Sequence, residues 1–212
     1  NFKVIDSEYS DEIKNKIQSI FWVRDMVNYP ALTKSPEFFQ EMVEGLIGGL
    51  DINLTVFDEK WILENNMGGV VGVAQGSDRS PKFLVGEYNP NAKKQVALIG
   101  KGVLFDSGGL SLKSPSGMET MKSDMAGAAT AWGIIALVAK QRVDVRLKVY
   151  TPIVENMPSG SAIRPGDVLK MRNGKTIEVM NTDAEGRLIM ADALAYASES
   201  SPDIICDVAT LT

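Results

Sequence analysis

Charged residues stand at alternate positions in the stretch NTDAEGRLIM (181–190), where Asp183, Glu185 and Arg187 precede an apolar run typical of a buried helix. A buried carboxylate loses its hydration, so it needs a cation or several hydrogen-bond donors to remain ionised. Two carboxylates so close together also repel each other. The spacing therefore raises the question of which cation compensates this charge.

Two further acids occupy comparable positions. Asp106 belongs to the glycine-rich stretch GKGVLFDSGG (100–109), which follows a buried strand, and ligands of α/β sheets usually collect beyond the carboxyl ends of strands. Asp124 lies three residues after Met121 and four before Ala128, which places it on the apolar stripe of a predicted helix. If the four acids converge, a pair of divalent ions removes their repulsion, and an oxygen-rich, histidine-free site favours Mg²⁺ or Mn²⁺ over Zn²⁺. Two alternatives stay open: the glycine-rich stretch could be a plain turn, and Asp124 could be a capped or partly exposed acid.

The sequence contains no histidine. That absence excludes Ser-His-Asp and Cys-His nucleophile systems and the H-E-x-x-H zinc site. Two nucleotide-binding motifs also fail, because the third glycine of G-x-G-x-x-G falls on Phe105 and the first glycine of a P-loop ending in NGKT (173–176) falls on Leu169. Any catalysis must therefore use carboxylates, lysine, arginine, tyrosine or a metal held by oxygen ligands.

The composition indicates a folded domain of 212 residues, with 44% hydrophobic and 23% charged residues. The net charge is -5 and the longest basic run is Lys93-Lys94, so nucleic acid is not expected as the primary partner. No apolar run approaches the roughly 20 residues that cross a bilayer. Cys206 is the only cysteine, so no internal disulfide can form. We expect a soluble cytoplasmic protein with no membrane partner.

Periodicity predicts the strands and helices that must position these residues. Apolar residues at steps of three and four predict helices, and alternating or continuous apolar runs predict strands. The predicted helices cover 10–28, 35–50, 59–65, 118–139 and 185–198, and the predicted strands cover 52–58, 81–88, 95–100, 145–154 and 203–211. Asn173-Gly174 predicts a hairpin turn within 167–180. The predicted fold class is α/β, with a mixed central β-sheet flanked by helices.

Six segments carry a resemblance to a known family: GKGVLFDSGGLSLK, MKSDMAGAA, ENMPSG, RPGDV, NTDAEGRL and DVATLT. In unbroken order from about Arg24 to Thr212, they resemble the leucine aminopeptidase (cytosol aminopeptidase) family of dinuclear metallo-aminopeptidases. NTDAEGRL is the most distinctive octapeptide of that family. The resemblance implies an aminopeptidase catalytic domain that hydrolyses the N-terminal residue, preferably Leu or another apolar residue, from peptide substrates by means of a water activated by two metals.

The resemblance also implies a ligand set for two divalent ions, Zn²⁺, Mn²⁺ or Mg²⁺. The matching residues are Lys101, Asp106, Asp124, Asp183 and Glu185. Asp106 and Glu185 would bridge both ions. Lys101 and Asp124 would complete the tighter site, and Asp183 would complete the looser site through its side chain and main-chain carbonyl. Lysine ligates a metal only as the neutral amine, so the dications must lower its ordinary pKa of about 10.4.

Other residues receive roles from the same resemblance. Lys113 matches a protonated lysine that stabilises the oxyanion of the tetrahedral intermediate, and Arg187 matches an arginine that binds a bicarbonate ion as general base. Met121 and Thr210 match residues that line the pocket for the first side chain, where a methionine wall is adaptable. Asn156 is expected to shape its loop rather than to take part in the chemistry.

The resemblance sets expectations about domains and assembly as well. Residues 1–28 would be a linking helix and 29–212 the catalytic metallopeptidase domain, without the N-terminal domain of the family. The C-terminal part would be missing, because the chain stops at Thr212 directly after an apolar strand. We expect a homo-hexamer for the full-length protein, and neither strong activity nor assembly for this chain alone. The alternatives are a non-enzymatic scaffold or binding role and a metal-dependent phosphatase or nuclease.

Overall fold

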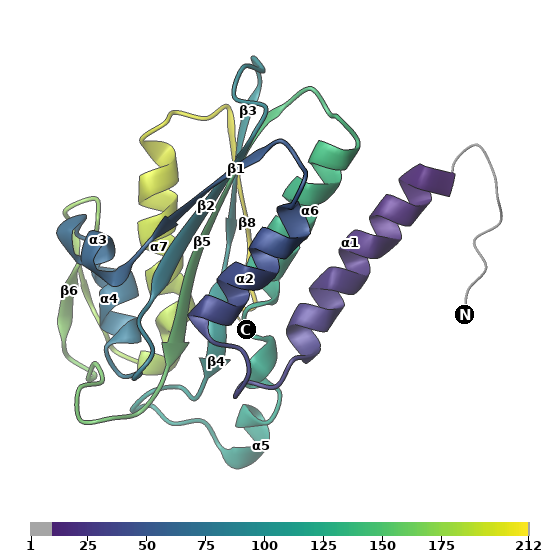
Figure 1. Ribbon diagram of the computed structural model, residues 1–212. Helices are drawn as coiled ribbons and strands as arrows, with labels where there is room; N and C mark the ends of the chain where they lie inside the picture. The colour runs from purple at the N-terminus through teal and green to yellow at the C-terminus, as the bar shows by residue number, and fades with distance from the viewer. Residues whose placement is uncertain (1–9, 212) are drawn as a thin grey trace.

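The computed structural model describes residues 10–211 (Figure 1), so residues 1–9 of the predicted linking helix and Thr212 lie outside the described part. Within it, six strands form one sheet in the order β1-β2-β5-β3-β8, with β4 pairing to β5. β2 pairs antiparallel with both β1 and β5, whereas β3, β4 and β8 run parallel to their neighbours. The strands are β1 (Ile52–Phe57), β2 (Lys82–Tyr88), β3 (Gln95–Gly100), β4 (Gly102–Asp106), β5 (Arg146–Asn156) and β8 (Ile204–Val208). The predicted mixed sheet is confirmed.

β3 and β4 are consecutive segments that both pair with β5, and Lys101 lies at the break between them. The backbone N–H of Lys101 donates to the Val208 carbonyl at 3.1 Å, and its carbonyl accepts from the N–H of Ala128 at 2.8 Å. Both backbone groups therefore bond outside the β5 ladder, which holds this lysine between β8 and the helix on one face of the sheet.

Helices cover both faces of the sheet (Figure 1). One layer contains α1 (Ser10–Asn28), α2 (Pro36–Ile47) and α6 (Ala126–Lys140), and the other contains α3 (Glu59–Glu64), α4 (Gly68–Ala74) and α7 (Glu185–Ser198). Each layer has its own core, with Trp132 and Phe39 fully buried in the first and Phe83 and Ile189 in the second. Burial of each such side chain contributes about 1.5–3 kcal/mol. Among the described helices, none is long and apolar enough to span a bilayer.

A small two-stranded sheet lies apart from the main one. β6 (Val168–Lys170) pairs antiparallel with β7 (Thr176–Glu178), and Gly174 in the connecting turn has a φ of 80°. Glycine adopts this left-handed conformation without steric cost. The predicted hairpin around Asn173-Gly174 is confirmed.

The predicted helix over 118–139 is wrong at its start. The structure has a short helix α5 (Pro115–Met118) and a 3₁₀ turn η1 (Met121–Ser123), and α6 begins only at Ala126. The carbonyl of Lys122 accepts a hydrogen bond from the Lys34 ammonium, which ties this turn to another part of the chain. The apolar spacing extends into this turn because Met125 is fully buried, although the backbone there is not helical. This burial is why the sequence pattern resembled a longer helix. Asp124 therefore lies in the turn before α6 and not on a helical stripe.

One strand of the main sheet and one of the helices that cover it are missing from the sequence prediction. β4 forms inside the glycine-rich stretch because β5 extends to Asn156 and offers it a parallel partner. α4 has the sequence GGVVGVA, and glycine and valine both have low helix propensity. A tertiary contact compensates, since the buried carboxylate of Asp192 accepts from the N–H groups of Gly69 at 2.7 Å and Val70 at 3.2 Å. These two donors belong to the first turn of the helix, where a carboxylate is stabilising.

A buried lysine anchors the segment before Asp124. Lys34 is fully buried, and its ammonium donates to the Met26 carbonyl at 3.0 Å, near the end of α1, and to the Lys122 carbonyl of η1. Within the described residues, no carboxylate forms an ion pair with it. Burial, followed by the charge of Lys122, lowers the pKa of Lys34 to about 8.

We predict that Lys34 makes the protein more stable as the pH rises above neutrality. Its pKa is about 8 in the folded state against an ordinary value of 10.5. Between these values the unfolded state binds more protons, so the free energy of unfolding increases with pH. Urea denaturation between about pH 7.5 and about pH 9.5 should show this rise. Lys34→Met should abolish it and the exposed control Lys93→Met should keep it; a flat profile for the parent contradicts the prediction.

Candidate metal centre

Three carboxylates meet where β4 ends. Asp106 is the last residue of β4, Asp124 lies in the turn before α6, and Glu185 is the first residue of α7. One oxygen from each lies within 4.8 Å of the others, and all three side chains are buried. The acids come from the sheet and from helix starts on its two faces, so the main fold itself brings them together.

Lys101 places an ammonium between two of these acids. Its Nζ lies 2.8 Å from Asp124 Oδ2 and 2.9 Å from Glu185 Oε1, and it donates to the Thr210 carbonyl at 2.8 Å. Burial lowers the pKa of Lys101, but the charges of Glu185 and Asp124 outweigh burial and raise that pKa above its ordinary value. Lys101 is thus the counter-cation of the buried acids, and its nitrogen must lose a proton before it can bind a metal.

Glu185 keeps one oxygen without a partner. Its Oε1 faces Lys101, whereas its Oε2 is buried and accepts no hydrogen bond from any residue that the structure describes. An unsatisfied buried acceptor costs free energy. Burial, and then the charge of Asp106, raise the pKa of Glu185 to about 7. A divalent cation would supply the missing partner, and a carboxylate-rich donor set suits such ions.

Lys113 joins Asp183 to the cluster. Its Nζ lies 2.9 Å from Asp106 Oδ2 and also pairs with Asp183, which belongs to the 3₁₀ turn η2 (Thr182–Ala184). Burial lowers the pKa of Lys113, but its hydrogen bonds to Asp183 and Asp106 outweigh burial and raise that pKa above its ordinary value. The two lysines differ in access, since the exposed fraction of the side chain is 4% for Lys101 and 17% for Lys113.

This chain matches the catalytic domain of the cytosol aminopeptidase family over residues 21–212. It belongs to that family. It is 51% identical over 191 residues to a probable cytosol aminopeptidase from Leifsonia xyli subsp. xyli, an alignment that covers 90% of this chain and 38% of that protein. The chain therefore spans well under half the length of this relative.

Two solved structures of the family's fold are similar to this chain. The cytosol aminopeptidase of Coxiella burnetii superposes with a TM-score of 0.92 at 38% identity, covering 97% of this chain and 45% of that one. The bottromycin maturation enzyme BotP in complex with Mn superposes with a TM-score of 0.92 at 35% identity, covering 99% of this chain and 47% of that one. The mixed sheet and its helices are therefore those of an aminopeptidase catalytic domain.

Three other residues matched to the cytosol aminopeptidases lie at different distances from the acids. Thr210 contacts them, because its Oγ1 donates to Asp124 Oδ1 at 2.7 Å. Met121 is half-buried in η1, three residues before Asp124. Arg187 is exposed on α7 and lines a hollow of about 350 Å³ with Asn181. Within residues 10–211, no ion pair joins Arg187 to the acids.

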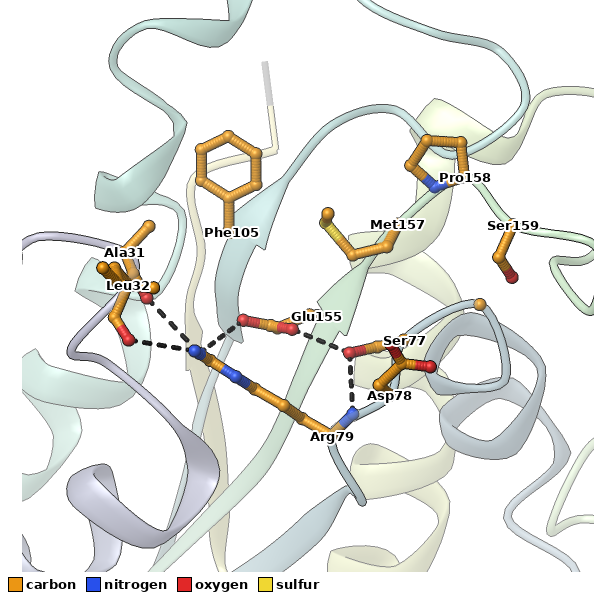
Figure 2. A pocket seen from close by; sticks show the side chains of 11 residues that line it. Ala31, Leu32, Ser77, Asp78, Arg79, Phe105, Glu155, Met157, Pro158 and Ser159 are labelled. Atoms are coloured by element: carbon orange, nitrogen blue, oxygen red, sulfur yellow. Dashed lines mark hydrogen bonds and ion pairs between the residues drawn. The ribbon is translucent and has the colours of Figure 1, made fainter.

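A second polar network lies at the ends of the same strands. Neighbouring side chains alternate along β5, so Glu155 points to the other face of the sheet from Asn156. Figure 2 shows Arg79 reaching Glu155, at 2.8 Å, and the backbone carbonyls of Ala31 and Leu32. These residues border a cavity of about 460 Å³. The network ties the segment between α1 and α2 to the end of β5.

Sequence reasoning missed the contact of Asn156 with this site. The buried side-chain amide of Asn156 donates to Asp106 Oδ1 at 2.9 Å and to the Thr182 carbonyl at 3.0 Å. A polar residue at the end of a buried strand was the available signal. The pairing of Asp106 with Asn156 depends on the register between β4 and β5, and β4 was not predicted.

We predict that Lys101→Met destabilises the protein in the presence of a chelator. The substitution removes a counter-cation from buried acids, and breaking a buried pair in this way costs about 3–5 kcal/mol. Urea denaturation in excess EDTA measures the loss. Lys175→Met, an exposed lysine in the β6–β7 turn, is the control and should behave as the parent. An unchanged free energy of unfolding for Lys101→Met would show that this ion pair contributes nothing.

Proposed function

We propose that the protein is a metal-dependent aminopeptidase that removes the N-terminal residue of peptides, with a preference for Leu and other apolar residues. The observation that carries the proposal is the buried group of Asp106, Asp124 and Glu185, in which one Glu185 oxygen has no partner. Membership of the cytosol aminopeptidase family supports the reaction class. The chain spans 38% of the length of its relative from Leifsonia xyli.

Five residues would hold two divalent ions. Asp106 and Glu185 would bridge the ions, Lys101 and Asp124 would complete one site, and Asp183 would complete the other through its side chain and main-chain carbonyl. Bound there, Mn²⁺ or Zn²⁺, with Mg²⁺ as a third candidate, would polarise the scissile carbonyl and activate a water. The oxygen-rich ligand set and the Mn complex of the bottromycin maturation enzyme support Mn²⁺.

Lys113 is the residue best suited to stabilise negative charge on the substrate. Asp106 and Asp183 fix its ammonium, and its raised pKa keeps it protonated at neutral pH. It is also more exposed than Lys101, which is closed off beneath the acids. A fixed ammonium beside the reacting carbonyl would stabilise the oxyanion of the tetrahedral intermediate.

Met121 and Thr210 would line the pocket for the first side chain of the substrate. Thr210 is fixed by its hydrogen bond to Asp124, so it would lie next to the reacting end of the peptide. Met121 is half-buried on a short turn, and the flexible thioether can adapt to different apolar side chains. This combination supports a preference for Leu without strict exclusion of other apolar residues.

Arg187 would bind a bicarbonate ion that acts as general base. Its guanidinium is exposed two residues after Glu185, and a guanidinium can donate two parallel hydrogen bonds to an oxyanion of this shape. The chain has no histidine, so a general base has to come from another source. An imported anion would meet that need.

The resemblance also supports proposals about organisation. Residues 1–28 would form a linking helix before a catalytic domain over 29–212, and the whole protein would be a cytoplasmic homo-hexamer, a location that the names of its relatives support. A non-enzymatic scaffold role is the alternative that the first experiment below distinguishes.

The first expected outcome is metal-dependent hydrolysis of a leucine anilide to leucine and the free arylamine. Activity should vanish after dialysis against a chelator and return with Mn²⁺ or Zn²⁺, and elemental analysis should find bound metal in the active sample. The control substrate is the same anilide with an acetylated amine, which an aminopeptidase should not cleave. A sample that shows no hydrolysis and contains no bound metal would favour the scaffold role.

The second expected outcome separates ligands from the oxyanion lysine. Lys113→Ala should keep its bound metal and lose about 10²–10³ in kcat, the usual effect of removing one oxyanion donor. Glu185→Ala should lose both metal and activity, because it removes a bridging ligand. Lys60→Ala, on the exposed surface of α3, is the control. If Glu185→Ala bound metal as tightly as the parent, the assignment of the bridging ligand would be wrong.

A further inference from the structure

We propose that Asn156 is a positioning residue that fixes the separation between Asp106 and Asp183. The inference rests on the metal site proposed above, because it concerns the spacing of two proposed ligands. Asp106 comes from the end of β4 and Asp183 comes from η2. Asn156 touches neither substrate nor metal in this scheme. It acts through the two acids that it holds in place.

The side-chain amide of Asn156 donates both of its hydrogens to groups that carry the two acids. One is donated to Asp106 Oδ1 at 2.9 Å and the other to the carbonyl of Thr182 at 3.0 Å. The Thr182 carbonyl belongs to the peptide group that leads directly into Asp183. A single planar amide therefore sets the distance between the Asp106 carboxylate and the backbone that carries Asp183.

Further hydrogen bonds make this connection rigid. The backbone carbonyl of Asn156 accepts from the N–H of Ser107 at 3.0 Å and from its hydroxyl at 2.7 Å. The loops after Asp106 and before Asp183 are also joined reciprocally, since Ser111 N–H donates to Thr182 Oγ1 at 2.8 Å and Thr182 N–H donates to Ser111 Oγ at 3.1 Å. The two loops consequently move as one unit with the end of β5.

The packing around the amide leaves it little freedom. Gly109 has a φ of 65°, and a Cβ on this residue would lie 2.8 Å from Asn156 Oδ1 and 3.0 Å from Thr182 Oγ1. The backbone of Gly109 therefore closes the space above the amide, and only glycine allows that approach without displacing Asn156. Asn156 itself is 2% exposed.

The donor character of the side chain matters more than its shape. An aspartate at position 156 would occupy nearly the same volume, but it would direct an oxygen at Asp106 Oδ1 and at the Thr182 carbonyl, both of which are acceptors. Buried acceptors that face each other repel. Lys113 already supplies the cation that links Asp106 to Asp183, and the neutral amide of Asn156 donates to Asp106 and to the carbonyl that precedes Asp183 without adding a charge to the site.

The test is the affinity for Mn²⁺, measured by titration calorimetry of the purified protein. Asn156→Asp should weaken Mn²⁺ binding by about ten- to a hundredfold, the usual effect of removing a partner that orients a ligand. Asn156→Ala, which removes the donors without adding a charge, should weaken binding in the same direction and serves if Asn156→Asp does not fold. Asn65→Asp, whose amide donates to the Trp61 carbonyl at 2.9 Å in a remote helix, should bind as the parent.

A second control separates positioning from a general loss of stability. Arg79→Met removes the ion pair with Glu155, and within the described residues neither side chain forms a hydrogen bond or ion pair with the four acids, so it should lower the urea midpoint while keeping the parent's Mn²⁺ affinity. Equal loss of affinity in Arg79→Met and Asn156→Ala at equal stability would overturn the positioning role. Parent affinity in the Asn156 variants would also overturn it and leave the metal site intact. A parent that binds no Mn²⁺ would overturn the metal site and this inference together.

Discussion

Four carboxylates gather at one end of the sheet, and their mutual repulsion is the constraint that the surrounding chain has to satisfy. Two like charges about 4 Å apart repel by roughly 4 kcal/mol at an effective dielectric constant of about 20. Asp106, Asp124 and Glu185 are buried, so water cannot screen them. Lys101 and Lys113 supply the compensating charge, each bonded to a different pair of acids. Without this division of charges the end of the sheet could not pack around them.

The fold delivers each charge by interrupting a regular element. The strand that pairs with β5 breaks at Lys101, which turns that lysine toward β8 and α6. Short 3₁₀ turns precede α6 and α7, and they bring Asp124, Asp183 and Glu185 to the same end of the sheet. Regular helices and strands would have placed these side chains at fixed periods along one face. The irregular turns are therefore what allow acids from both helical layers to meet.

The sequence predicted which residues meet at the site better than it predicted their local backbone structure. The resemblance carried by GKGVLFDSGGLSLK, MKSDMAGAA and NTDAEGRL singled out the acids and the two lysines, and the structure brings these side chains together. Three features depended on contacts between distant segments and were not accessible: the turn at Asp124, which Lys34 ties to α1; the helix α4, which Asp192 stabilises; and the hydrogen bond from Asn156 to Asp106. Local propensity carries no information about partners that lie far along the chain.

The two lysines also bear on how tightly the site could hold a metal. In this structure Lys101 is a protonated partner of Asp124 and Glu185, so a metal that takes these oxygens has to displace an ion pair and a proton. The measured binding free energy would then be the free energy of the metal–ligand bonds minus that of the ion pair that they replace. Lys113 pairs in the same way with Asp106 and Asp183, so a metal that takes those oxygens has to replace these contacts as well. Lys101 thus holds the acids together before any metal binds. Among the described residues Glu185 Oε2 has no hydrogen-bond donor, so a divalent cation would form an interaction there that Lys101 does not.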